Sequence, residues 1–488
     1  MIRPGAGDLH LGDQTPNVPL RAGSLRFAGT VANSVGIMAP AAGVSFIPAL
    51  MAGIVGGAGP LSMILALGAM LLVAYAFVTF TRVFNSAGSV YTFNGRALGV
   101  TYGFISAWLL LGVYTAYAAS TYVSNANALR VLLAEPGPHA AGGVLVWVAQ
   151  HWIVLAVALW ALTVWFTHRS IRLSSLVIFA CEGVALTLVA IVGVTVVAHG
   201  GFGGHSLSLA PFTARGLPVA TIGLGVVFAF TGFSGFEVAA TLGEEAKLPA
   251  RVVPISMVAA LVLAGVVYTL MAWVETIAFR SPGALAASAA NSVPLADVAT
   301  AYLSPVMGTL VVCASLISGV GAQLACVNGA TRVLFALGRD GFGPAWVARV
   351  HPRHRSPSGA LLVIAVLSLI AFLPLIGGNP LTAFFYLATY GADLIIVAYL
   401  MTVVAALVWS WQHGRRHPLH LAILLAGIAA LAYILRTTVY PVPAFPFNLL
   451  IYLTGAMLVL GAGLILLVPG LRCRLSGSPL FAIASATS

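Results

Sequence analysis

Two short stretches of this sequence combine residues that interrupt a helix with backbone groups that could bind charged ligands. The stretches are residues 36–43 (GIMAPAAG) and residues 231–237 (TGFSGFE). Glycine and proline weaken a helix in its interior, and backbone N–H and carbonyl groups there lose their partners. Free N–H groups at the start of a helix attract anions, and free carbonyls at its end attract cations. We therefore expect a carboxylate site around residues 37–43 and an ammonium site around residues 230–232.

An anion site that faces a cation site describes an α-amino acid held mainly through the backbone. Pro40 suits the first position of a restarted helix, because its missing N–H is not needed there. The rings of Phe230, Phe233 and Phe236 would shape or gate a pocket for the ligand's side chain, although such rings also simply pack between helices. The candidate substrate-binding residues are Gly36, Ile37, Met38, Ala39, Pro40, Gly43, Phe230, Thr231, Gly232, Phe233 and Ser234.

A carboxyl group deep inside an apolar stretch is the second feature that could do chemistry. Glu182 lies about 10 residues into the stretch that begins near residue 172, or roughly 15 Å along a helix. Charged side chains at such depth are costly and are functional candidates by default. Because burial away from water disfavours a carboxylate, Glu182 is our candidate for proton coupling. The structural alternative is a protonated Glu182 bonded to a neighbouring backbone carbonyl.

Other polar groups in apolar stretches receive different interpretations. We expect Glu237 to hold the second interruption together by accepting hydrogen bonds from free N–H groups. Asp393 lies near the middle of its stretch, and Glu275 near the outer end of its own, where it can reach the membrane surface. The hydroxyls of Ser315 and Ser318 keep sodium coupling open, although isolated serines more often bond within or between helices. No cofactor and no metal are expected beyond a coupling ion.

The composition indicates which elements position these residues. Of the 488 residues, 60% are hydrophobic and 7% are charged, whereas soluble domains carry about 25% charged residues. Apolar runs of roughly 20 residues, enough to cross a bilayer, recur along the chain without the alternation of barrel strands. We predict an all-α polytopic membrane protein with twelve transmembrane helices. The predicted spans are residues 24–55, 59–80, 98–131, 143–166, 172–198, 218–242, 252–278, 302–336, 358–376, 381–410, 419–438 and 448–469.

The basic residues predict an orientation for these spans. With the N-terminus inside, 18 of the 22 Lys and Arg residues fall on the cytoplasmic side, as the positive-inside rule expects. The exceptions are Arg130, Arg215, Arg280 and Arg436. This distribution explains the net charge of +11 without a nucleic-acid partner. Residues 1–22, which lack the apolar core of a signal peptide, and residues 471–488 are then short cytoplasmic tails of a cytoplasmic (inner) membrane protein.

The two interruptions fall at matching positions if the chain is built from two halves. They lie in spans one and six, so residues 24–198 (spans one to five) and 218–410 (spans six to ten) would form inverted repeats, followed by residues 419–469 (spans eleven and twelve). Paired Gly/Pro-interrupted spans are a pointer to a transporter's binding site. Glycine and proline also occur in membrane helices only for packing or kinking. Two matched interruptions favour the binding site.

Several motifs resemble those of the amino acid–polyamine–organocation permeases. They are residues 228–237 (FAFTGFSGFE) with residues 243–249 (GEEAKLP), residues 328–332 (NGATR) and residues 338–341 (GRDG). The resemblance covers residues 24–470 in the number and order of spans. It implies the five-plus-five inverted-repeat (LeuT-like) fold with broken helices 1 and 6, whose backbone binds the substrate's carboxylate and amine. Relatives can also carry an ionisable residue near Glu182 in place of a sodium site.

One departure from the family pattern leaves the substrate open. Family members usually have a Gly-Ser-Gly-like triplet at the first interruption, and Gly36-Ile37-Met38 stands there instead. The backbone donors survive this change, but a serine hydroxyl contact does not. We therefore expect proton-coupled transport of a neutral amino acid. The alternative is an amino acid/polyamine exchanger or small-amine carrier, and a transporter-like nutrient sensor is a third hypothesis. The partners are then substrate and lipid, with the chain a monomer or weak oligomer.

Other functions lack their sequence signals. There is no phosphate-binding loop with its Gly-Lys-Ser/Thr, and no segment outside the spans is long enough for a soluble catalytic domain. We therefore expect no enzyme. His413 and His417 flank two arginines and a proline, so a cytoplasmic loop explains them better than a metal site. The four cysteines show no paired spacing and are interpreted as packing residues.

Overall fold

The computed structural model describes residues 20, 22–134, 151–204, 207–214, 216–288, 293–375 and 378–477. In these residues, twelve helical segments are long and apolar enough to cross a membrane. The described chain has no β-strand, only a single bridge between Leu25 and Ala246. The predicted all-α architecture with twelve spans is confirmed, and the protein is a multi-pass membrane protein.

The segments are α1 with α2 (Phe27–Met38, Pro40–Val44), α3 with η1 and α4 (Ile47–Val55, Gly56–Ala58, Gly59–Thr81), α6 (Val100–Ala134), α8 (Trp152–Arg169), α9 with η2 (Ile171–Ala198, Phe202–Gly204), α10 with α11 (Val219–Phe233, Val238–Thr241), α12 (Pro249–Ala278), α15 (Pro305–Arg339), α16 with η5 (Ser358–Phe372, Leu373–Leu375), α17 (Pro380–Gln412), α18 (Pro418–Val439) and α19 (Phe447–Leu467). Shorter helices are α5 (Val90–Leu98), η3 (Ala210–Phe212), α13 (Pro282–Ser288), α14 (Pro294–Tyr302), η4 (Ala345–Ala348) and α20 (Leu471–Ser476).

The first predicted span, residues 24–55, is divided into three helices. The chain leaves helical geometry at Ala39 and again at Phe46, where φ is −139° and ψ is −39°. Pro40 and Pro48 each lie in the first turn of the helix that follows. Proline is favoured in this first turn. Helix α3 therefore continues through a short turn into α4 instead of completing a single helix with α1.

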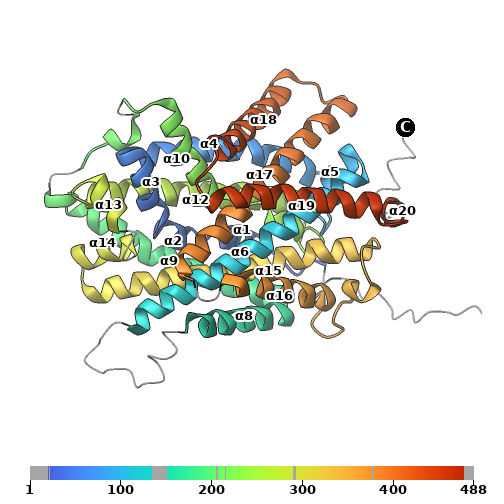
Figure 1. The fold of residues 1–488 in the computed structure, drawn as a ribbon, viewed down its shortest axis with the longest axis horizontal. Coiled ribbons are helices and arrows are strands. Elements are labelled where there is room, and N and C mark those ends of the chain that lie inside the picture. The colour runs from blue at the N-terminus through green and yellow to red at the C-terminus, as the bar shows by residue number, and fades with distance from the viewer. Residues whose placement is uncertain are drawn as a thin grey trace, which may run out of the picture.

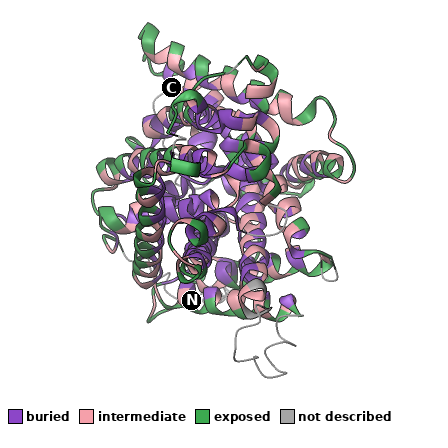
Figure 2. Cartoon of the chain, turned by 90° about the vertical axis from the view of Figure 1, so that its left-hand side faces the viewer, coloured by how far each residue is buried: buried purple, intermediate pink, exposed green. Residues whose placement is uncertain are grey.

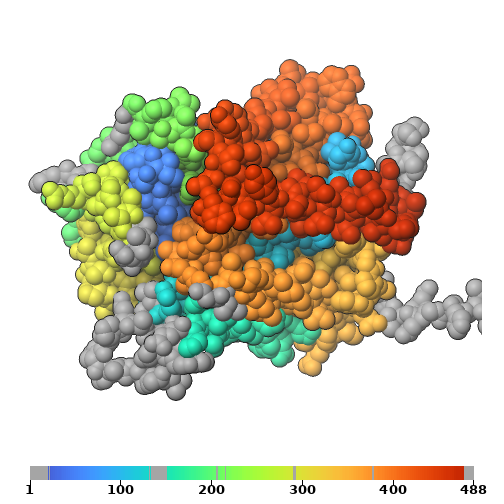
Figure 3. Space-filling view, in the orientation of Figure 1, coloured from blue at the N-terminus to red at the C-terminus, as the bar shows by residue number. Residues whose placement is uncertain are grey.

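The long helices form a packed centre, and the C-terminal helices lie outside it. Helix α6 packs along α15 and α17, and α15 also contacts α1 and α9. In Figure 1, α18 projects at the top and α19 crosses in front of the other helices, and Figure 3 shows the same C-terminal segment exposed across this face. Buried residues gather in the interior, while exposed residues lie on the outer helices (Figure 2).

The outer surface is apolar, as a lipid environment requires. Val194, Val459 and Leu467 are 70%, 71% and 81% exposed. Exposing apolar side chains to water costs about 25 cal/mol of free energy for each Å². Contact with lipid tails removes that cost. This surface therefore supports the assignment of a membrane protein.

The predicted tails lie mostly beyond the described residues. Of residues 1–22, only residues 20 and 22 are described, and residues 478–488 are not. Residues 471–476 form helix α20, whose Leu471 and Leu475 are buried. The inverted-repeat relation between the two halves stays a prediction.

Candidate functional site

The chain turns sharply between α1 and α2, at the first Gly/Pro-rich stretch. Ala39 adopts left-handed geometry (φ 42°, ψ 59°), and its N–H donates to the carbonyls of Val35 and Gly36 at 2.8 and 3.1 Å. Helix α2 then begins at Pro40, and the N–H of Ala42 donates to Ser318 Oγ at 3.2 Å. A donor in the first turn of α2 is thus directed toward α15.

The second stretch leaves helical geometry slightly later than the sequence suggested. Helix α10 was expected to end near residues 230–232, but it continues to Phe233. Ser234 is then extended, Gly235 has a φ of +98°, and α11 begins at Val238. Only glycine adopts such a φ readily, which explains why the chain turns at Gly235.

The two stretches touch each other. A Cβ atom on Gly235 would lie 1.9 Å from Cγ2 of Ile37. The hydroxyl of Ser34 donates to the Phe236 carbonyl at 2.6 Å. Side chains of α1 therefore contact the backbone between α10 and α11 inside the bundle.

The close approach at Gly235 makes a testable prediction. We expect Gly235→Ala to destabilise the protein by about 2–4 kcal/mol, because the new methyl group overlaps Ile37 and the positive φ strains any other residue. Gly183→Ala is the matched control, since a Cβ there meets nothing within 4 Å. Thermal unfolding of the two purified variants in detergent measures the difference. Equal melting temperatures would contradict the prediction.

A cavity of about 190 Å³ adjoins both stretches. The predicted residues that line it are Ile37, Met38, Ala39, Gly43, Thr231, Gly232 and Ser234. The sequence did not single out its other lining residues, which are Ala42, Phe46, Ile47, Leu50, Tyr117, Ser120, Thr121, Ser124, Asn125, Phe228, Tyr268, Gly319, Cys326, Phe384, Phe385, Ala388 and Thr389. The walls therefore come from α1–α3, α6, α10, α12, α15 and α17.

The other predicted residues do not line this cavity; they are Gly36, Pro40, Phe230 and Phe233. A Cβ on Gly36 would meet Ile178 of α9 at 2.7 Å, so this glycine permits close helix packing. Phe230 packs against Tyr399, and Phe233 against Tyr268. Phe46, Phe228, Phe384 and Phe385 supply the aromatic wall in their place.

Tyr268 of α12 contacts both stretches, although no local sequence pattern singles it out. Its hydroxyl donates to the Met38 carbonyl at 2.7 Å, which uses one carbonyl at the end of α1. A Cβ on Gly43 would lie 2.2 Å from the same hydroxyl oxygen. Tyr268 is fully buried and lines the cavity. Gly43 is thus required for the close approach of α2 to α12.

Glu237 binds two tyrosines beside the second stretch. Its Oε1 accepts from the Tyr114 hydroxyl at 2.7 Å, and its Oε2 accepts from the Tyr399 hydroxyl. The Tyr399 oxygen also accepts the Gly235 N–H at 3.1 Å. The carboxyl group therefore links α6 and α17 to the interruption. The link to α17 includes the backbone, because Tyr399 contacts both Glu237 and the Gly235 N–H.

Glu182 of α9 is buried and is connected to the cavity through one side chain. Its Oε1 accepts from Ser318 Oγ at 2.8 Å, and the same Oγ accepts the N–H of Ala42, a lining residue. Within the described chain, Oε2 of Glu182 has no hydrogen-bond partner. Since Glu182 is only 4% exposed, this oxygen is also withdrawn from water.

Glu275 and Asp393 do not line the cavity. Glu275 was expected to reach the membrane surface, but it is fully buried on α12, because its helix continues to Ala278 and other helices cover it. Neither of its carboxyl oxygens has a partner among the described residues. Asp393 of α17 is also buried, 5% exposed.

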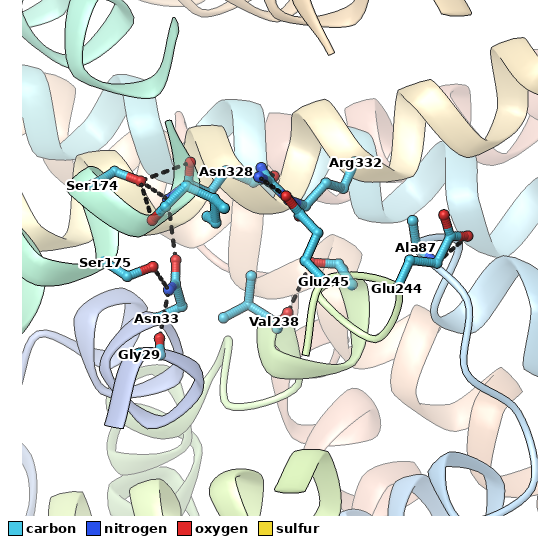
Figure 4. Close-up of polar contacts among 12 residues, drawn as sticks. Gly29, Asn33, Ala87, Ser174, Ser175, Val238, Glu244, Glu245, Asn328 and Arg332 are labelled. Carbon is cyan, nitrogen blue, oxygen red and sulfur yellow. Dashed lines mark hydrogen bonds and ion pairs between the residues drawn. The ribbon is translucent and has the colours of Figure 1, made fainter. Parts of the chain in front are cut away.

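Buried polar contacts tie α1, α9 and α15 together on the side where α1 begins (Figure 4). Asn33 donates to Ser175 Oγ at 2.7 Å, and Asn328 donates to Asn33 Oδ1 and to Ser174 Oγ, both at 3.1 Å. These bonds join three helices that are not neighbours along the chain. Along α1, Asn33 lies between the N-terminal end of the helix and the residues that line the cavity.

Two ion pairs also link α15 to the segment that follows α11. Arg332 of α15 pairs with Glu245, which follows α11, at 2.5 Å, and both side chains are 2% exposed. Arg339 pairs with Glu244 at 2.9 Å, but its side chain is 34% exposed. Figure 4 shows Glu245 pointing toward Arg332 and Glu244 toward the backbone of Ala87. The first pair is therefore the one withdrawn from water.

Comparisons with known proteins show similarity to membrane transporters. A family described as "Amino acid permease" matches residues 25–466. An uncharacterized transporter of Mycobacterium tuberculosis is 30% identical over 359 residues, 72% of each chain. The low-affinity putrescine importer PlaP of Escherichia coli is 28% identical, over 66% of this chain and 68% of its own. The branched-chain amino acid permease BcaP of Bacillus subtilis is 27% identical, over 62% and 64%.

Proposed function

Because this chain belongs to the amino acid permease family, we propose that it is a secondary transporter that carries a neutral amino acid across the cytoplasmic membrane together with protons. The observation that carries the proposal is the cavity beside the two helix interruptions. Its walls combine backbone at both interruptions with apolar side chains. Such a site can hold the carboxylate and ammonium groups through the backbone while apolar walls hold the side chain.

The chemistry of the walls favours a neutral, apolar side chain. No charged residue is among those that line the cavity in the described chain. Ile47, Leu50, Phe228, Phe384 and Phe385 supply apolar contacts. A charged group in such a cavity loses its hydration without a partner, which is costly. The relative named as a branched-chain amino acid permease is in line with this preference.

A small-amine carrier is the second candidate function. The relative named as a putrescine importer and the altered triplet at residues 36–38 both favour it. A diamine needs two negative partners, however, and neither Glu182 nor Glu237 lines the cavity. Glu237 also already accepts from two tyrosines. The amino acid is therefore the better proposal.

Protons are proposed as the coupling ion because of the contacts of Glu182. Sodium would need the hydroxyl oxygen of Ser318 as a ligand, and one lone pair of that oxygen already accepts the Ala42 N–H. Protonation of Glu182 would remove the negative charge that accepts from the same hydroxyl and change the bond at Ser318, which reaches the cavity through Ala42. Proton binding and substrate binding are thus coupled by two hydrogen bonds.

Uptake into proteoliposomes with an inward proton gradient tests the proposed function. We expect leucine, isoleucine or valine to accumulate and a protonophore to abolish this accumulation. Lysine and putrescine should compete at least about tenfold less well, since burying a second charge costs more than the 1.4 kcal/mol that a tenfold difference represents. Competition by diamines alone would overturn the amino acid assignment in favour of the amine carrier.

A further inference from the structure

Three histidines that are far apart in the sequence meet at one end of the bundle. His168 is in the last turn of α8, and His351 and His354 lie in the loop between η4 and α16. One ring nitrogen from each lies within 4.8 Å of the others, and each residue is partly exposed. The ring centroids are 4.7–5.4 Å apart. None of the three histidines lines the cavity described above.

The surrounding backbone holds these rings in place. The Ser356 hydroxyl donates to the His168 carbonyl at 2.8 Å, which ties the loop to the end of α8. The loop is also closed on itself, because the N–H of His351 donates to the Ser356 carbonyl and the N–H of Arg355 donates to the His351 carbonyl, both at 2.8 Å. Helices α8 and α16 lie side by side (Figure 1). The cluster is therefore built on two packed helices and a braced loop.

We propose that His168, His351 and His354 form a binding site for a divalent transition-metal ion such as Zn²⁺ or Ni²⁺. Three imidazoles with an open fourth position for water match a known zinc ligand set. Nitrogen ligands without a carboxylate select zinc, nickel or copper over magnesium and calcium. Metal–nitrogen bonds are about 2.0–2.1 Å long. Nitrogens bound to one ion therefore lie closer together than 4.8 Å, so the three side chains must approach one another slightly.

Two local features oppose metal binding: a hydrogen bond to one ring and the positive charges of two nearby arginines. The N–H of His354 donates to Nδ1 of His351 at 3.2 Å, and coordination through either nitrogen of that ring removes this long hydrogen bond. Arg169 and Arg353 lie close enough to act on the charge of His354. Their positive charges disfavour weakly bound cations, so only a metal with strong affinity for imidazole should occupy the site.

Titration calorimetry on the full chain tests the site. The protein is purified in detergent without a histidine tag, stripped with a chelator and titrated with ZnCl₂. We expect one equivalent to bind and the affinity to fall at least tenfold in a variant combining His351→Ala with His354→Ala. The matched control combines His413→Ala with His417→Ala, which removes two exposed histidines from another loop. Unchanged binding in the first variant, or no binding by the natural chain, would overturn the site.

A second readout separates loss of the site from loss of folding. Zinc should raise the melting temperature of the natural chain and of the His413/His417 control. It should not raise that of the single variant His354→Asn, which loses one imidazole but keeps a polar side chain at this position. X-ray absorption of the nickel-loaded protein should show three imidazole ligands. A spectrum with fewer than two imidazoles would contradict the assignment.

Discussion

Glu182→Gln is expected to abolish accumulation of substrate against its concentration gradient while exchange of substrate across the membrane continues. Glutamine has the size of a protonated glutamic acid, but it cannot release or bind a proton. Its amide can still bond Ser318, so the contact from Ser318 to the Ala42 N–H persists. The variant should therefore resemble a permanently protonated carrier, with gradient-driven uptake reduced at least about tenfold and counterflow within about twofold of the natural chain.

Both activities can be measured in the same proteoliposomes, with and without a proton gradient. Glu275→Gln is the matched control, because Glu275 is also a buried carboxyl, but neither of its oxygens has a hydrogen-bond partner among the described residues. It should keep gradient-driven uptake. If Glu182→Gln accumulates substrate with an unchanged pH dependence, or if both variants lose uptake equally, Glu182 is not the coupling group.

The large features of the fold could be predicted because lipid imposes a simple rule. A helix must be apolar along about 20 residues to cross the bilayer, and this signal is continuous along the chain. Proline and glycine at residues 36–43 and 231–237 likewise act locally, since they change the backbone at their own position. Features of this kind do not depend on which helices become neighbours.

The contacts that complete the site depend on tertiary packing, and the sequence contains no local signal for them. Tyr268 is one tyrosine within an apolar helix, and only the approach of α12 to α1 places its hydroxyl on the Met38 carbonyl. The same holds for Tyr399, which reaches Glu237 from α17. The aromatic wall was expected from Phe230, Phe233 and Phe236. In the folded chain these rings pack against tyrosines of α17 and α12, and other phenylalanines line the cavity.

Arg332→Met should destabilise the protein by about 3–5 kcal/mol, because it leaves the carboxylate of Glu245 buried without a partner. The guanidinium now holds both oxygens of that carboxylate, at 2.5 and 3.3 Å, and donates to the Asn328 carbonyl at 3.0 Å. Adding Glu245→Met removes the unpaired charge, so the double variant should recover most of the lost stability. Thermal or denaturant unfolding in detergent measures both effects.

Arg339→Met provides the comparison, since it breaks an ion pair of the same type whose arginine is 34% exposed. Exposed pairs contribute about 0–1 kcal/mol, so this variant should stay close to the natural chain. A loss in Arg332→Met no larger than that in Arg339→Met would show that the buried pair is not the main tie between α15 and the segment after α11. If the proposed transport cycle separates α15 from the segment after α11, this pair must open in each cycle. The double variant should therefore also change the rate of counterflow, whereas Arg339→Met should not.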